Sequence, residues 1–133
     1  MTDFSGKWVL ETTENMEAFV AADGMAWAMR KAASAMGWGT GKHFITMTMT
    51  PGANEIDVQE KTPMFDKTYK LICDGEMRPY ESPQDKNAVM SSAWDGASLV
   101  HVLHKDGGKK VTNMRRTLEG RAFYRLENLS GYR

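Results

Sequence analysis

Apolar and polar residues alternate along most of the chain, and helical spacing is confined to one early segment. In residues 4–11 the alternation around Trp8 predicts a strand with one buried face. Apolar residues then recur at helical spacing over residues 16–20. A second stretch of high helix propensity covers residues 25–36 and ends at Gly37. The chain is therefore predicted to begin as a strand followed by two helices.

From residue 42 onward, turn signals such as Pro51-Gly52 and Asp95-Gly96 recur at short intervals. The predicted strands between the turns cover residues 43–50, 55–61, 67–73, 87–93, 98–104, 109–118 and 121–129. Strands at regular hairpin spacing, with no helix between them, pair as an antiparallel meander that is closed or nearly closed. We therefore expect a mainly β fold, an up-and-down antiparallel β-barrel with a helix-turn-helix lid. It forms a single domain over residues 1–133.

Composition restricts the setting of this fold. Lys and Arg total 17 residues and so do Asp and Glu, so no overall positive charge predicts a nucleic-acid partner. The single cysteine, Cys73, cannot form an internal disulfide, and the N-terminus lacks the basic and apolar stretches of a signal peptide. No apolar run approaches the roughly 20 residues that span a bilayer. We therefore expect a reducing, cytoplasmic setting.

Charge and methionine are unevenly used. Residues 1–23 carry five acidic groups against Lys7, a net charge of −4, whereas residues 105–133 carry eight basic groups against three acidic ones, a net charge of +5. The basic end fits a buried anion and a solvated surface equally well. The chain has 11 methionines, whose flexible side chains suit either an irregular core or a surface that adapts to varied ligands.

The order of these segments resembles the intracellular fatty-acid-binding proteins, relatives of the cellular retinoid carriers. The motifs that carry the resemblance are Phe4-Ser5-Gly6-Lys7-Trp8-Val9-Leu10, Glu14-Asn15 with Glu17, Phe19 and Gly24, Ala28 with Arg30-Lys31, Phe65-Asp66-Lys67-Thr68, and Trp94-Asp95-Gly96 with Leu99-Val100-His101-Val102 and Asp106-Gly107. The resemblance implies a barrel of about ten strands around an apolar cavity. It also implies a monomer that reversibly binds and transports a long-chain fatty acid or similar apolar ligand, with no enzymatic activity.

The resemblance also implies where an acidic head group binds. The family places one arginine on a late strand and an Arg-x-Tyr pair on its tenth and last strand. Arg115 matches the first arginine and is the first choice for the anion anchor; only one of Arg115 and Arg116 can face inward. On this alignment residues 121–129 form the ninth strand, and the tenth has no counterpart. An alternative alignment makes them the last strand. Tyr124 and Arg125 are the next candidates, and only one of this pair can face inward.

Further ligand contacts are expected at the mouth of the barrel, where the helices cover it. The candidates are Phe19, Met16, Met25, Met29 and Phe65. For Phe19, plain packing of the helix on the barrel explains the residue equally well. Arg30-Lys31 and the basic C-terminal stretch leave open a transient contact with a membrane, or a membrane-peripheral role.

His101 is a candidate ligand contact and the only candidate base for an alternative function, that of a lipid-modifying barrel enzyme. His101 and His104 lie three residues apart on a predicted strand and therefore face opposite sides, and no acidic or cysteine cluster completes a metal site. We expect no metal and no cofactor. A carrier of a retinoid, a bile acid or a planar pigment stays open as the alternative with the same fold.

Overall fold

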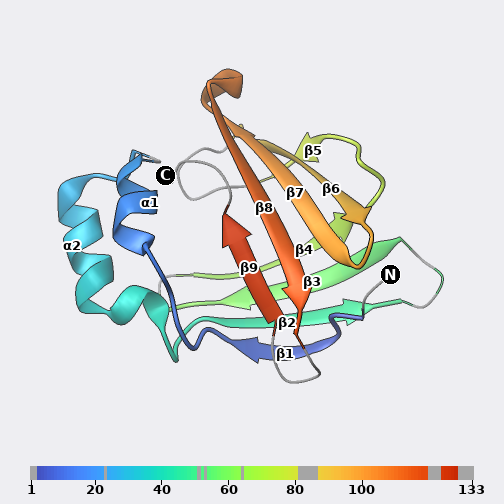
Figure 1. The fold of residues 1–133 in the computed structure, drawn as a ribbon, viewed down its shortest axis with the longest axis horizontal. Coiled ribbons are helices and arrows are strands. Elements are labelled where there is room, and N and C mark those ends of the chain that lie inside the picture. Colours follow the sequence, from blue (N-terminus) through green and yellow to red (C-terminus); the bar gives the residue numbers. More distant parts are fainter. Residues whose placement is uncertain are drawn as a thin grey trace.

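The structure is a computed structural model that describes residues 3–22, 24–50, 52, 54–63, 65–80, 87–119 and 124–128, the last of these by backbone alone. Within this part the predicted order of strand, two helices and a run of strands is found (Figure 1). The elements are β1 (Gly6–Val9), α1 (Met16–Ala22), α2 (Trp27–Ala35), η1 (Gly37–Gly39), β2 (Phe44–Met49), β3 (Glu55–Lys61), β4 (Asp66–Ile72), β5 (Arg78–Pro79), β6 (Val89–Asp95), β7 (Ser98–Lys105), η2 (Asp106–Gly108), β8 (Lys110–Leu118) and β9 (Tyr124–Asn128).

The strands form two antiparallel sheets, β1-β2-β3-β4 and β5-β6-β7-β8-β9. Within each sheet every strand pairs with its neighbours in sequence, as the hairpin spacing predicts, whereas β4 and β5 belong to different sheets. The short strand β5 is absent from the sequence prediction, because two residues, one of them proline, carry no alternation. Its approach is held instead by Arg78, which binds both carboxylate oxygens of Asp74 at 2.6 Å.

Successive hairpins turn at opposite ends of the molecule, so the β3–β4 and β7–β8 turns share one end. The two helices lie at the end of the first sheet where β3 passes into β4 (Figure 1). The turn between α1 and α2 also lies beside the start of β8. A Cβ atom placed on Gly24 would come within 2.6 Å of Nζ of Lys110. The helix pair therefore occupies the lid position expected from the sequence, and we call this end the lid end.

The opposite end is filled by an apolar core to which both sheets contribute. Its buried members are Phe4, Met47, Ile56, Val58, Leu71, Cys73 and Leu99. Phe4 stacks on Trp94, with ring centroids 6.2 Å apart and an interplanar angle of 17°. Burial of each large apolar side chain stabilises the fold by roughly 1.5–3 kcal/mol. The polar side chains that face the interior, such as His101 and Glu60, lie between this core and the lid.

The lid itself is lightly packed. Val20 is the buried residue of α1, and α2 has none. The helices are joined by Arg30, which binds Glu17 at 3.1 Å and the carbonyl oxygen of Met25 at 2.6 Å. Few buried apolar contacts mean a low free energy of local opening. Within the described residues, no helix combines the length and the apolar character needed to cross a membrane.

Candidate ligand-binding site

The interior face of β8 carries Arg116, whereas Arg115 lies on the outer face. Arg116 is 6% exposed and stands opposite Leu99 of the core. The side chain of Arg115 is 33% exposed and forms an ion pair with Asp95, Nη2 to Oδ2, at 2.7 Å. The orientation expected for Arg115 is thereby reversed. Of the two arginines, Arg116 is the one that faces inward, because neighbouring residues on a strand point to opposite faces.

Arg116 belongs to a buried chain of hydrogen bonds that crosses three strands. Its Nε donates to Nε2 of His101 at 3.0 Å, and Nδ1 of His101 lies 2.8 Å from Oγ of Ser92. Because a guanidinium can only donate, Nε2 must accept, and the imidazole therefore carries its proton on Nδ1. This proton is donated to Ser92. The imidazole thus fixes the position of the guanidinium in the interior.

His101 is held in its neutral form. The residue is 1% exposed. Burial, together with the positive charge of Arg116, lowers the pKa of His101 to about 3. An imidazole whose accepting nitrogen is already occupied, and which donates to the serine rather than accepting from it, is poorly arranged to act as a base. The geometry gives His101 a positioning role beside Arg116.

A second polar cluster lies on the interior face of the first sheet. Glu60 receives the hydroxyl of Tyr69 on Oε1 at 3.0 Å, and its Oε2 lies 2.8 Å from Nε2 of His43. Burial alone would raise the pKa of Glu60, but the hydrogen bond and charge of His43, the charge of Lys67 and the Tyr69 hydrogen bond outweigh it, so the pKa is lowered. Burial and the charge of Glu60 raise the pKa of Tyr69, which keeps its phenol a donor.

Lys67 completes this cluster, and sequence reasoning did not single it out. Its Nζ hydrogen-bonds the hydroxyl of Tyr80 at 3.2 Å. It also lies over three aromatic rings, 5.3 Å from the centroid of Phe65, 5.2 Å from Tyr69 and 4.8 Å from Tyr80. A cation over aromatic faces is attracted by their negative charge density. The contacts cross from β4 to the segment after β5, which no sequence pattern could pair.

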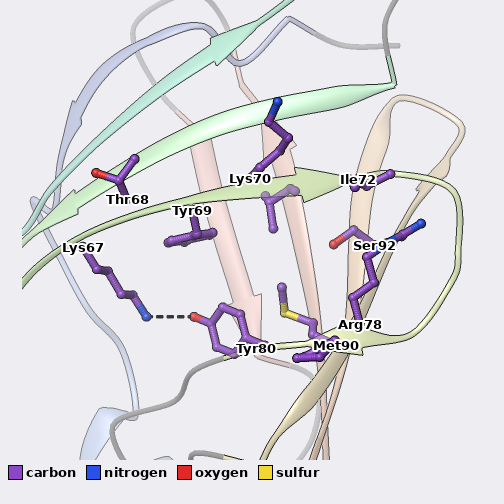
Figure 2. A pocket seen from close by; sticks show the side chains of 11 residues that line it. Lys67, Thr68, Tyr69, Lys70, Ile72, Arg78, Tyr80, Met90 and Ser92 are labelled. Atoms are coloured by element: carbon purple, nitrogen blue, oxygen red, sulfur yellow. Dashed lines mark hydrogen bonds between the residues drawn. The ribbon is translucent and has the colours of Figure 1, made fainter.

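A cavity of about 140 Å³ lies between β4 and the β5–β6 hairpin. Its lining includes Lys67, Tyr69 and Tyr80 on one side and Met90 and Ser92 on the other (Figure 2). Ser92 is also the last member of the chain from Arg116. The cavity therefore touches both polar clusters, with apolar side chains between them.

The expected portal residues are placed near the lid end, with differing burial. Phe19, Met16, Met25 and Phe65 are half-buried, and Phe65 forms the turn between β3 and β4. Met29, expected as a ligand contact at the mouth of the barrel, is 52% exposed. Trp27, on the same helix, is 65% exposed.

Two candidates of the last strand cannot be placed by side chain. β9 pairs Tyr124 with Leu118 and Arg125 with Thr117, and the side chains of Tyr124 and Arg125 lie outside the described residues. The question of a tenth strand falls outside them as well.

Near Arg116, Trp94 faces the interior with a buried Nε1 that has no hydrogen-bond partner among the described residues. This donor is a feature that the sequence pattern did not indicate.

A larger hollow, of about 500 Å³, lies on the outer face of the first sheet. Its lining includes Lys7, Phe44, Gln59 and Lys61, which alternate along their strands with the residues that face the interior. The hollow is therefore separate from the two polar clusters. Its open, lysine-rich surface is typical of a solvated face.

No protein-family model matches the chain, and no curated protein matches it. Solved structures do match. Human cRBP IV superposes with a TM-score of 0.76 at 19% identity, over 97% of this chain and 90% of that one. The fatty-acid-binding protein 1 of Echinococcus granulosus gives 0.72 at 17% identity, over 95% and 89%. The fluorescent protein UnaG gives 0.73 at 20% identity, over 96% and 90%.

At these identities the likeness concerns the fold. It confirms the expected up-and-down antiparallel barrel architecture with a helical lid, and it agrees with the resemblance carried by the sequence motifs. The chain has the fold of the intracellular fatty-acid-binding and retinoid-binding proteins.

Proposed function

We propose that the protein reversibly binds and carries an apolar acid, such as a long-chain fatty acid, with the acid group bound by Arg116. The observation that carries this proposal is a guanidinium that is 6% exposed, faces the interior and is positioned by a neutral imidazole. Its Nε donates to Nε2 of His101. A planar guanidinium suits a carboxylate, because two parallel N–H groups match its two oxygens.

The electrostatics favour an anionic ligand over a neutral one. A buried charge is costly unless an opposite charge or several hydrogen bonds compensate it. His101 is neutral, so the positive charge of this hydrogen-bonded pair lies on Arg116. An acid entering from the lid end would therefore place its charge where a positive one is already fixed. Its hydrocarbon part would lie against the apolar side chains, gaining roughly 25 cal/mol for each Å² removed from water.

Several other features agree with this carrier function. The solved structures of similar fold include proteins whose titles name fatty-acid binding or fatty-acid transport. The lightly packed helix pair gives a route for entry, with Phe65, Phe19, Met16 and Met25 as ligand contacts at the mouth. The one cysteine, Cys73, is a buried free thiol, which is compatible with the cytoplasmic location that we retain within this proposal.

The enzyme alternative receives no support from His101, since Arg116 occupies its accepting nitrogen. The alternative of a pigment or retinoid carrier is kept, because the same cavity and the same arginine suit any apolar acid. The similarity in fold to UnaG, a fluorescent protein, keeps a coloured ligand within this class. A neutral retinoid would not use the charge of Arg116.

Two measurements test the proposal. Native mass spectrometry of the purified protein, followed by extraction, identifies whatever ligand co-purifies. Calorimetric titration then compares hexadecanoic acid with hexadecanol in the wild type, in Arg116→Gln and in Arg115→Gln as the matched outer-face control. We expect Arg116→Gln to weaken the acid on the order of a hundredfold and the alcohol far less, because a charge is stranded. Equal effects of both substitutions would overturn the proposal.

A further inference from the structure

The buried hydroxyl group of Ser92 has a proton for which the described part of the chain offers no acceptor. Ser92 is 3% exposed, and its Oγ lies 2.8 Å from Nδ1 of His101. Because Nε2 of His101 accepts from Arg116, Nδ1 carries the imidazole proton and donates it to the serine oxygen. The serine hydroxyl therefore keeps its own proton to donate. A buried donor without an acceptor is unfavourable, so this proton needs a partner from outside the chain.

Ser92 belongs to the lining of the cavity of about 140 Å³ between β4 and the β5–β6 hairpin (Figure 2). The hydroxyl of Tyr80, in the same lining, is in a similar state. Its oxygen accepts from Nζ of Lys67 at 3.2 Å, and none of the residues that the structure describes accepts its own proton. Leu71 and Met90 add apolar surface to the cavity. The cavity thus presents hydroxyl donors on a partly apolar wall.

The charges of the lining favour a neutral acceptor over a second anion. Each of its three cations has a carboxylate of the protein close by. The pairs are Arg78 with Asp74 at 2.6 Å, Lys70 with Glu55 at 3.1 Å, and Lys67 with Glu60, on which the charge of Lys67 acts. An anion in the cavity would compete with these carboxylates, whereas a neutral oxygen needs only a hydrogen-bond donor, which Ser92 supplies.

We propose that the ligand is an apolar acid with a ketone or ether oxygen in its chain, and that this oxygen accepts a hydrogen bond from Ser92. This inference rests on the proposed function and narrows its ligand class. Only one imidazole separates Ser92 from Arg116, so the oxygen lies in the half of the chain nearer to the acid group. An unsubstituted fatty acid would cover the hydroxyl with apolar atoms and leave it unpaired, and a site with buried donors discriminates against such a ligand. A hydroxyl group on the ligand would bring one more donor into the cavity.

The test compares octadecanoic acid with a series of oxooctadecanoic acids, in which the ketone moves along the chain, by calorimetric titration. In the wild type we expect one ketone position, in the half nearer to the carboxylate, to bind roughly tenfold more tightly than the unsubstituted acid, because it supplies the missing acceptor. Ser92→Ala removes the hydroxyl and should abolish this maximum. Ser91→Ala, at the next position on the outer face of β6, is the matched control and should keep it.

Infrared spectroscopy of the bound ligand gives a second measurement, which is decisive in the wild type even if Ser92→Ala unfolds. A hydrogen bond lowers the stretching frequency of a ketone, and an isotopic label separates this band from those of the protein. At the favoured position the band should lie below its frequency in dry hydrocarbon. In folded Ser92→Ala it should return toward that frequency.

The outcomes separate the two proposals. Equal affinities along the whole series in the wild type, a maximum that survives in Ser92→Ala, or an unshifted ketone band would overturn the oxygen site and leave the role of Arg116 standing. If Arg116→Gln weakens neither octadecanoic acid nor its oxo derivatives, the proposed function fails. A thermal melt of each variant shows whether it is folded.

Discussion

Arg116 donates a hydrogen bond from Nε to Nε2 of His101 over 3.0 Å, and both residues are buried. This contact makes the imidazole an acceptor on one side and a donor to Ser92 on the other. A side chain at position 101 that cannot both accept and donate would leave the guanidinium of Arg116 or the hydroxyl of Ser92 without its hydrogen bond to this position. The stability of the interior and the position of the anion site are therefore coupled at His101.

We predict that His101→Leu lowers the free energy of unfolding by about 2–4 kcal/mol, because a buried charged donor loses its acceptor. His101→Gln should lose clearly less, since an amide can accept from Arg116 and donate to Ser92. Urea unfolding measures both. His104→Leu, on the opposite face of β7, is the control and should change little. Similar losses at positions 101 and 104 would contradict the buried chain.

Stability should also depend on pH through His101. Burial first, and the charge of Arg116 second, lower its pKa from 6.5 to about 3 in the folded protein. Between these values the unfolded chain binds a proton that the folded chain excludes. The contribution is therefore fully present above about pH 6.5 and is lost as the pH falls toward 3.

From pH 7.5 to pH 5 the loss should be about 2 kcal/mol, given roughly 1.4 kcal/mol per pK unit. Urea unfolding at the two pH values measures it, and the interval avoids most carboxylate titration. In His101→Gln this part of the pH dependence should disappear, whereas His104→Gln should keep it. An unchanged dependence in His101→Gln would show that the imidazole is not held neutral.

Phe65 should control ligand exchange more than stability. Its ring lies over the ammonium of Lys67 at 5.3 Å, in the turn beside the lid. We predict that Phe65→Ala changes the association and dissociation rates of a fluorescent fatty acid several-fold in stopped-flow measurements. The melting temperature should shift by only a few degrees, because the side chain is only half-buried. Met77→Ala, an exposed apolar position at the end opposite the lid, should leave both rates unaltered.

The lid turn should not tolerate a side chain at Gly24. Gly24 has a φ of +93°, and a Cβ atom there would come within 2.6 Å of Nζ of Lys110. Gly24→Ala should therefore destabilise the protein by about 1 kcal/mol or more. Against a Lys110→Ala background the same substitution should still cost most of this amount, because the flexible end of Lys110 can move aside and the backbone strain remains. If Gly24→Ala costs nothing in the Lys110→Ala background in a urea titration, the backbone conformation is not the cause.

The sequence predicted most of the fold because its signals are local. Alternation and turn residues suffice to mark strands such as β3 and β7, and helical spacing marks the lid. The burial of the lid helices was not predictable in the same way. The sequence analysis places Met29 at the mouth of the barrel, yet its side chain is exposed, since a helix with apolar residues on several sides gives no unique facing.

The candidate site was predicted less well. The family resemblance points to Arg115, but the alternation on its own strand favours Arg116. Met114 and Leu118, two residues on either side of Arg116, share its inward face. The local alternation is therefore the signal that identifies the inward-facing arginine. The partners of the interior groups, such as Tyr80 for Lys67 and Ser92 for His101, come from other strands, and only the folded register brings them together.

The gap between β4 and the β5–β6 hairpin has a mechanical consequence. Within the described residues the strand ladders run separately through the two sheets, and a backbone hydrogen bond from Gly75 to Ser92 links them at 2.8 Å. Parting the sheets farther along this line separates Tyr69 from Tyr80 and lengthens the contact of Lys67, while every ladder stays whole. The space between the two sheets can therefore widen along this gap. A wider ligand can be accommodated while every strand keeps its hydrogen-bonded partners.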